Sequence, residues 1–267
     1  MTTGTAGERR RLVSIRRDDH VATITLARPE ALNAISGVMA DDLRMAAGEV
    51  ATDADAWIVV IDAEGDKAFC VGADLKERSG FDLEDYYENR RQVRDMFAAL
   101  RSIPQPTIAS IFGFALGGGF EIALSCDLIV AAEGTQMGLP EARVGLLPAG
   151  GGTQLLTRRL GPGRAKDLIF RGRRIDADEA HGLGLVCRVV PLANLDETTR
   201  EIAAEVGRAS PVAVREAKRS IDGALGVPLD EGIELEDAAW KQVIVSEDRA
   251  EGIAAFNEKR EPRWRNA

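Results

Sequence analysis

FALGGGFEIALSCD, residues 114–127, decides the fold of this chain. Its first residues end an apolar run, PTIASIFGFA at 106–115, which predicts a buried strand. Three consecutive glycines then lead into a short helical pattern from Gly118 to about Ser125, and the run DLIVAAE at 127–133 predicts the next strand. A strand, a helix and a strand at this spacing indicate β-α repeats and a mostly parallel sheet, which is the α/β class.

The alternation of strands and helices fills the N-terminal half, whereas the C-terminal quarter reads as helices alone. Pro211 and Pro228 lie where first-turn prolines are favoured. We therefore expect a helical appendage whose apolar stripes pack on the core, on another subunit, or on both. The predicted strands are 21–28, 57–63, 106–115, 127–133 and 186–191, and the predicted helices are 36–50, 82–101, 118–125, 154–160, 195–208, 211–224, 229–246 and 249–259.

Composition bounds the class of protein. The 267 residues, 45% hydrophobic and 29% charged, suffice for a sizeable core and suggest one large domain or a domain with an appendage. The formal net charge of −9 makes the chain a poor general binder of nucleic acid or of anionic membranes. We expect neither as a partner, and any phosphate-bearing ligand needs a local concentration of basic residues.

The cysteines, the lack of a long apolar run and the N-terminal sequence favour a cytoplasmic protein. Cys70, Cys126 and Cys187 are scattered and odd in number, and the chain has only two histidines, so neither a disulfide framework nor a metal site is expected. We expect three buried or half-buried thiols. No apolar run approaches the roughly 18 to 20 residues that span a bilayer, and the first twelve residues lack the apolar region of a signal peptide. The expected location is the cytoplasm.

Two glutamates stand in unusual surroundings. Glu121 follows the three glycines, and Glu141 lies in MGLPEARVGLLPAGGGTQ after a proline. A glycine turn before a helix lets a backbone approach a ligand closely and exposes free N–H groups. The same turn could instead serve only helix-on-strand packing, and Glu141 could be a first-turn residue that favours the helix dipole.

A third motif, KAFCVGADLKE at 67–77, lies between a strand and a helix. Gly72 permits a bend that would direct the N–H of Ala73 into a cavity, although an ordinary strand-to-helix loop would also fit. None of the glycine-rich stretches has the Gly-Lys-Ser/Thr ending of a nucleotide-binding P-loop, and the glycines at 150–152 are interpreted as a loop before the next helix.

Together these motifs resemble the crotonase, or enoyl-CoA hydratase/isomerase, superfamily. The resemblance runs from about Val13 to the end, through family-like segments in family order: RPEALNAIS, FCVGADLKE, FALGGGFEIALSCD, GLPEARVGLLPAGGGTQLLTRRLG, ADEAHGLGLV and EDRAEGIAAFNEKR. It implies a spiral of β-β-α units at 1–200 that carries an acyl-CoA site. A C-terminal helical region at 201–267 would build homotrimers, often paired into hexamers.

The resemblance also implies roles for individual residues. The N–H groups of Ala73 and Gly118 match an oxyanion hole for a thioester oxygen, and Glu121 and Glu141 match the two catalytic glutamates of the hydratases. These groups would add water to a trans-2-enoyl-CoA through an enolate. No metal or separate cofactor is implied, because coenzyme A is part of the substrate. The implied CoA-binding residues are Ala31, Leu32, Asp74, Leu75 and Lys76, with Phe256 and Lys259 reaching a neighbouring subunit's site.

Departures from the family pattern leave the substrate open. Phe120 and Val71 replace smaller residues common at their positions, which would alter the acyl pocket. We expect the pocket width to depend on the region 78–85 and on four phenylalanines, Phe81, Phe112, Phe114 and Phe120. A 3-methylglutaconyl-CoA hydratase, another crotonase activity such as double-bond isomerisation, and a non-catalytic acyl-CoA-binding protein are the alternatives.

Overall fold

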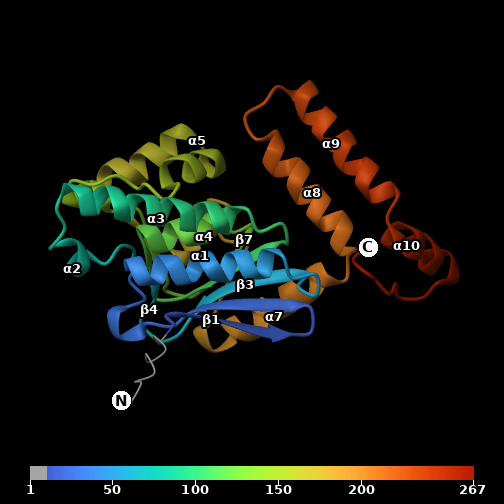
Figure 1. Ribbon diagram of the computed structural model, residues 1–267, viewed down its shortest axis with the longest axis horizontal. Helices are drawn as coiled ribbons and strands as arrows, with labels where there is room; N and C mark the ends of the chain where they lie inside the picture. Colours follow the sequence, from blue (N-terminus) through green and yellow to red (C-terminus); the bar gives the residue numbers. More distant parts are fainter. Residues whose placement is uncertain (1–10) are drawn as a thin grey trace, which may run out of the picture.

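The computed structural model of the protein describes residues 11–267 (Figure 1). The signal-peptide expectation for the N-terminus concerns mainly residues 1–10, which lie outside the described residues. The strands are β1 (Val13–Asp18), β2 (Val21–Leu26), β3 (Ile58–Ala63), β4 (Ala68–Cys70), β5 (Thr107–Ile111), β6 (Phe114–Leu116), β7 (Leu128–Ala132), β8 (Gln136–Gly138), β9 (Arg174–Asp176) and β10 (Arg188–Val190).

The helices account for most of the remaining chain. The α-helices are α1 (Gly37–Ala51), α2 (Leu75–Arg78), α3 (Leu83–Arg101), α4 (Gly118–Ser125), α5 (Gly152–Arg171), α6 (Ala177–Gly182), α7 (Leu195–Gly207), α8 (Pro211–Ala224), α9 (Leu229–Ile244) and α10 (Glu247–Glu258). Three short 3-10 helices, η1 (Pro29–Ala31), η2 (Glu141–Val144) and η3 (Leu192–Asn194), complete the described elements.

The strands form two sheets. Six of them make one sheet in the order β1-β2-β3-β5-β7-β10, and the other four make a second in the order β4-β6-β8-β9. All neighbouring strands are parallel except the pairs β1–β2 and β8–β9. The expected mostly parallel α/β architecture is therefore confirmed.

Successive strand pairs build the β-β-α spiral. The pairs β3–β4, β5–β6 and β7–β8 each place their first strand in the six-stranded sheet and their second in the four-stranded sheet before a helix follows. The single strand predicted at 106–115 was therefore wrong, because the chain turns at Gly113 between β5 and β6. Gly113 has a φ of 58°, and a Cβ there would lie 2.0 Å from the Lys67 carbonyl oxygen.

Most other predicted elements are present with shifted ends. The helix expected at 154–160 is the longer α5, which bends where Gly161 has a φ of 76°. Ser36 and Asp82, expected as first helical residues, are instead N-caps whose side chains accept from the N–H groups of Met39 and Asp85. The strands β1, β4, β8 and β9 and the helices α2 and α6 lie outside the predicted ranges, because each is short or lacks a clear apolar period.

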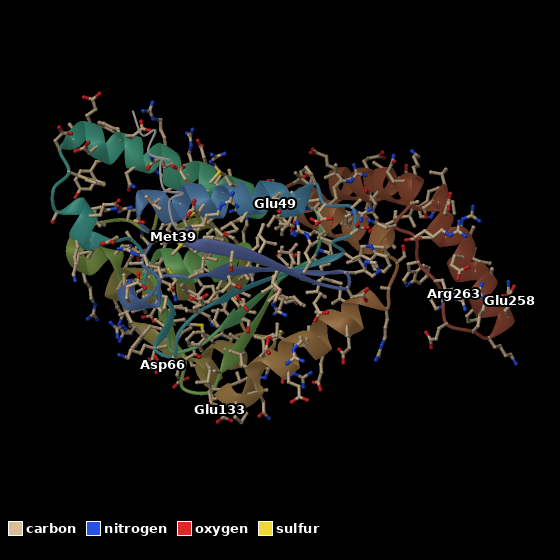
Figure 2. All side chains as sticks on the ribbon, turned by 60° about the horizontal axis from the view of Figure 1, so that its bottom comes forward. Met39, Glu49, Asp66, Glu133, Glu258 and Arg263 are labelled. Atoms are coloured by element: carbon tan, nitrogen blue, oxygen red, sulfur yellow. The ribbon has the colours of Figure 1, made fainter. Side chains whose placement is uncertain are left out.

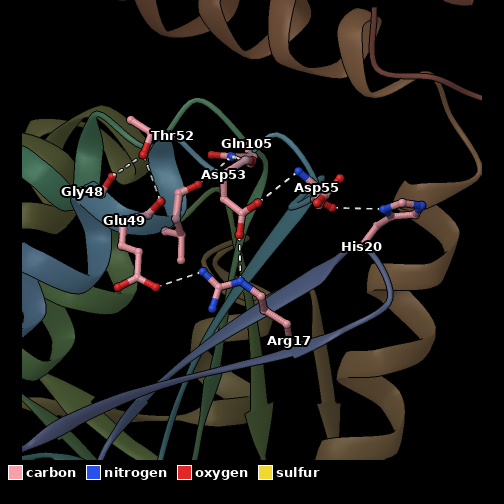
Figure 3. Close-up of polar contacts among 9 residues, drawn as sticks. Arg17, His20, Gly48, Glu49, Thr52, Asp53, Asp55 and Gln105 are labelled. Atoms are coloured by element: carbon pink, nitrogen blue, oxygen red, sulfur yellow. Dashed lines mark hydrogen bonds and ion pairs between the residues drawn. The ribbon is translucent and has the colours of Figure 1, made fainter.

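Helices cover both faces of the large sheet. One core cluster lies between this sheet, α1, α3 and α4, and a second lies between β3, β5, β7 and α7. In Figure 1, α1 and α3 lie on one side of the strands and α7 lies on the other. A cluster of polar side chains fixes the C-terminal end of α1 beside the sheet (Figure 3). Arg17 donates to Glu49 and Asp53, and Gln105 donates to the Val50 carbonyl oxygen.

The C-terminal helices project from this core. Figure 2 shows Glu258 and Arg263 at the end of the molecule opposite Met39. The tail is held near the core because Trp264 Nε1 donates to the Arg208 carbonyl oxygen at 2.9 Å. Residue 200, the proposed limit of the core, lies inside α7, which packs on the large sheet. The division into 1–200 and 201–267 stays a prediction.

Three further expectations concern thiols, membranes and metals. Cys70 and Cys126 are buried, but Cys187 is exposed, so the prediction of three buried or half-buried thiols was wrong for that residue. Between residues 11 and 267, no helix is long and apolar enough to cross a bilayer. Over the same range, no three histidine, cysteine or acidic side chains cluster closely enough to hold a metal ion.

Candidate active site

The glycine turn, the Glu141 loop and the inner face of α3 surround a cavity of about 510 Å³. Its walls come from segments that are far apart in sequence but that the spiral brings together. Four of the residues predicted for catalysis line this cavity: Ala73, Gly118, Glu121 and Glu141.

The glycine turn makes room for Glu141 and for close helix packing. Gly117 has a φ of 52°, and a Cβ there would lie 2.9 Å from Glu141 Oε1. A Cβ on Gly119 would lie 2.1 Å from the Cys70 carbonyl oxygen on β4. Helix-on-strand packing and access to a ligand site therefore both require this turn, and neither interpretation excludes the other.

Two free backbone N–H groups meet at the cavity. Ile35 N donates to Gly72 O at 2.8 Å and Asp74 N donates to Ile35 O at 3.0 Å, so the intervening Ala73 N–H points away from that bridge. Within residues 11–267, neither the Ala73 N–H nor the Gly118 N–H has an acceptor. A Cβ on Gly72 would lie 3.0 Å from Gly118 N, which shows how closely the two loops approach.

Glu121 is a fixed, buried carboxylate. The residue is 3% exposed, and Oε1 accepts hydrogen bonds of 2.7 Å from the N–H groups of both Gly150 and Gly152. Burial raises the pKa of Glu121, and the hydrogen bonds from the glycine loop oppose that rise. The two N–H donors fix the orientation of one carboxylate oxygen.

Glu141 is less buried than Glu121 and has fewer hydrogen bonds. It begins η2, and its Oε2 is buried with no hydrogen-bond partner in the described part of the chain. Burial raises the pKa of Glu141 to about 7, and the negative charge of Glu121 adds to the rise. A proton can therefore reside on Glu141 near neutral pH while Glu121 accepts two hydrogen bonds.

Four of the seven predicted CoA-binding residues, Ala31, Leu32, Leu75 and Lys76, belong to segments in or next to the cavity wall. Leu75 lines it, and Leu32 lies beside the same loop because Val71 N donates to Leu32 O at 3.2 Å. Ala31 ends η1 just before Leu32, and Lys76 is exposed in α2.

Asp74 has both oxygens occupied inside the chain. It caps α2 through the N–H groups of Lys76 and Glu77, and it forms an ion pair of 2.8 Å with Arg28. These bonds suit a residue that holds the Leu32 and Leu75 segments together. The predicted direct contact of Asp74 with CoA stays a prediction.

Phe256 and Lys259 lie far from their own chain's cavity. Both belong to the α10 end of the appendage, where the Phe256 residue is 84% exposed. Neither lines the cavity of this chain. Their placement leaves the predicted contribution to a neighbouring subunit untested.

Several residues that line the cavity were not predicted from the sequence. Phe81, Phe112, Phe114 and Phe120 were expected to set the width of the pocket, but none of them lines it. Phe120 and Phe112 are buried in the core clusters. The aromatic residues that line the cavity are Tyr86 and Phe97, both on α3. The period of α3 could have revealed its inner stripe, at positions 86, 89, 90, 93 and 97.

Sequence comparison with known proteins identifies relatives over almost the whole chain. The family model for enoyl-CoA hydratase/isomerase matches residues 16–267. The short-chain-enoyl-CoA hydratase of Clostridium acetobutylicum is 36% identical, with 93% of this chain and 95% of that protein covered. The human mitochondrial enoyl-CoA hydratase domain-containing protein 2 is 39% identical, with 92% of this chain and 86% of that protein covered.

A solved structure agrees with the whole fold. The crystal structure of an enoyl-CoA hydratase from Bacillus anthracis superimposes with a TM-score of 0.93 at 40% identity, covering 96% of this chain and 100% of that one. The crotonase resemblance drawn from the motifs is thereby confirmed. The chain belongs to the enoyl-CoA hydratase/isomerase family.

Proposed function

We propose that the protein is an enoyl-CoA hydratase, which adds water reversibly to a trans-2-enoyl-CoA to give a 3-hydroxyacyl-CoA. The observation that best supports the proposal is that two carboxylates and two N–H groups without acceptors line one cavity. Hydration needs this set, since charge develops on the thioester oxygen while one proton leaves water and another reaches carbon.

The roles follow from the surroundings of each group. Glu121, held by the Gly150 and Gly152 N–H groups, accepts a proton from water as the oxygen bonds to the β-carbon. The Ala73 and Gly118 N–H groups stabilise the enolate oxygen, and each such donor is typically worth about 3–4 kcal/mol. Glu141, with a pKa of about 7, donates its proton to the α-carbon. The pair then holds the same number of protons as before.

Substrate binding and assembly complete the proposal. Ala31, Leu32, Leu75 and Lys76 would hold the CoA moiety, which is supported by Leu75 in the cavity wall and by the hydrogen bond from Val71 N to Leu32 O. Phe256 and Lys259 would serve the site of a neighbouring subunit in a homotrimer or hexamer. The enzyme would need no metal and no cofactor apart from the CoA of its substrate, and it would work in the cytoplasm.

Loss of the conjugated-enoyl ultraviolet absorbance of crotonyl-CoA tests the reaction. We expect rapid loss with the native protein and a decrease of about 10²–10⁴ in kcat for Glu121→Gln and for Glu141→Gln. A matched control is Glu49→Gln, because Glu49 is a surface residue paired with Arg17. Binding of crotonyl-CoA without turnover by the native protein would instead support the acyl-CoA-binding alternative.

An isomerase is the nearest alternative within the family. Moving a double bond needs one carboxylate that shuttles a proton and no added water, so the second carboxylate favours hydration. Mixing the protein with a trans-3-enoyl-CoA and identifying the first product would distinguish them. A conjugated 2-enoyl product that is not hydrated further would overturn the proposal.

A further inference from the structure

One wall of the cavity is a single stripe of α3. Tyr86, Asn89, Arg90, Val93 and Phe97 all line the cavity, at spacings of i, i+3, i+4, i+7 and i+11. This spacing places the five side chains on one face of the helix. The stripe is polar toward the N-terminus of α3 and apolar toward the C-terminus.

The apolar end of the stripe lies beside the carboxylate of Glu121. A Cβ built on Gly150 would lie 2.2 Å from Phe97 Cε2 and 2.7 Å from Glu121 Oε2, so both side chains flank this glycine. Asn89 precedes Phe97 by eight residues, which is about 12 Å along a helix axis. A substrate that reacts beside Glu121 can therefore extend its acyl chain along α3 toward Asn89.

Asn89 is a buried amide with no partner inside the protein. The residue is 5% exposed, and no group among residues 11–267 forms a hydrogen bond with its side chain. The Asn89 amide atoms are not fully enclosed, so they are accessible from the cavity, where a ligand can hydrogen-bond to them in place of water. An amide that lines a cavity and has no internal partner is suited to bind a polar group of a ligand.

Arg90 adds a positive charge beside this amide. Its charge reaches the cavity, since it lowers the pKa of Glu121, and no ion pair neutralises it in the described part of the chain. The next residue, Arg91, is instead paired with Glu88. Among the described residues that line the cavity, only Glu121 and Glu141 are acidic, so no carboxylate of this lining competes at the Asn89 end.

We propose, on the basis of the hydratase function above, that Asn89 and Arg90 select a 2-enoyl-CoA whose acyl chain ends in a carboxylate. Arg90 neutralises the carboxylate and the Asn89 amide donates a hydrogen bond to it. A plain alkyl chain of the same length would leave the amide unpaired, and sites built to bind a polar group discriminate against analogues that lack it.

The test compares two substrates on each protein. The quantity measured is kcat/KM for trans-2-octenedioyl-CoA divided by kcat/KM for trans-2-octenoyl-CoA, with the six-carbon pair as a second length. Dividing the two values cancels any difference in the amount of folded enzyme. We expect a ratio of at least about ten in the native protein, a tenfold discrimination. The ratio should fall about tenfold or more in Asn89→Leu and in Arg90→Gln.

Arg91→Gln is the matched control, because it removes the same charge from the outer face of the same helix. Its ratio should stay within about twofold of the native value, as expected for an exposed charge. A native ratio below one at both lengths would overturn the proposal. So would an equal loss on both substrates in Arg90→Gln, which would assign Arg90 to the CoA phosphates.

Activity on crotonyl-CoA distinguishes a failure of the acyl preference from a failure of the hydratase function. If it is hydrated but the dicarboxylic substrates are not preferred, the acyl preference alone is wrong. If neither crotonyl-CoA nor any longer enoyl-CoA is hydrated, the hydratase function itself fails, and the acyl preference fails with it.

Discussion

Glu121 and Gly150 are joined by a hydrogen bond of 2.7 Å, from the Gly150 N–H to Glu121 Oε1. The carboxylate leaves no room for a side chain at that glycine, because a Cβ there would lie 2.7 Å from Glu121 Oε2 and 2.2 Å from Phe97 Cε2. The conformation of the loop at 148–152 and the position of the carboxylate therefore depend on each other.

Gly150→Ala should move the Glu121 carboxylate and reduce kcat/KM for crotonyl-CoA about 10²-fold, the effect of a displacement of about 1 Å at a catalytic centre. The control is Gly163→Ala, since a Cβ at Gly163 in α5 would meet no other atom within 4 Å. That change should leave activity unaltered. Equal kinetics in the two variants would contradict the dependence of Glu121 on this loop.

Arg101 should act as a positioning residue. Its Nη1 donates at 3.0 Å to the carbonyl oxygen of Gly150, the residue whose N–H holds Glu121. We expect Arg101→Met to lower kcat about tenfold, within the range for a misplaced acid–base group, while KM changes little. Arg101→Lys should restore part of the rate.

The matched control for Arg101 is Arg94→Met, which removes an exposed arginine of α3 paired with Asp95. It should leave both kcat and KM close to their native values. An increase of KM alone in Arg101→Met would show that Arg101 binds substrate rather than holding the loop.

The pH dependence should report one proton shared by the two glutamates. Hydration needs Glu121 ionised and Glu141 protonated, and dehydration needs the reverse, so both directions use the singly protonated pair. We expect bell-shaped profiles of kcat/KM that coincide in the two directions, with the alkaline limb near the Glu141 pKa of about 7. A profile that keeps rising to pH 9 would contradict the assignment of Glu141 as proton donor.

The same carboxyl group should destabilise the native protein at alkaline pH. The folded pKa of Glu141, about 7, lies above its ordinary value of 4.5, so the folded state binds the proton more tightly than the unfolded state. Its stabilising contribution is complete below about pH 4.5 and is lost as pH rises to about 7. With partial solvent screening, Glu141→Gln should gain on the order of 1–2 kcal/mol in unfolding free energy at pH 8.

Urea unfolding of the two proteins at pH 5 and pH 8 measures this gain. The advantage of Glu141→Gln should be larger at pH 8, and it should come with a loss of activity. A constant difference at the two pH values would show that the carboxyl group is not desolvated in the folded state.

The sequence predicted the ligand-facing motifs better than the walls around them. Glycine runs before Glu121 signal a close backbone approach, and that requirement is local, so the turn could be recognised without a fold. The Gly150 and Gly152 donors to Glu121 lie about thirty positions away in sequence and are brought close only by the spiral. No local pattern contains such a pairing.

The acyl wall was missed for a related reason. Met96 and Leu100 of α3 are buried in the core, so the apolar pattern of the helix marks mainly its core face. The cavity face of the same helix carries Asn89 and Arg90, and polar residues on a helix are ordinarily assigned to solvent. Phe120 was misassigned because its neighbour Glu121 faces the cavity, whereas successive residues of a helix point in different directions.

Lys218 should control how firmly the helical appendage is joined to the core. Its Nζ donates to Asp127 Oδ2 at 2.8 Å and to the Gln105 carbonyl oxygen at 2.9 Å, so one side chain of α8 reaches the ends of two strands. The Lys218 side chain is 14% exposed, and truncating it leaves the Asp127 charge with only the donors of Thr107. We expect Lys218→Met to lower the free energy of opening α8 and α9 by about 1–3 kcal/mol.

Hydrogen exchange measures that opening directly. Amides of α8 and α9 in Lys218→Met should exchange faster by about one to two powers of ten, while those of β3 and β5 in the core keep their protection. Lys241→Met is the matched control, because Lys241 pairs with Asp237 on the exposed face of α9 and should contribute little. If both variants exchange at the native rate, packing of apolar side chains, rather than the Lys218 ion pair, joins the appendage to the core.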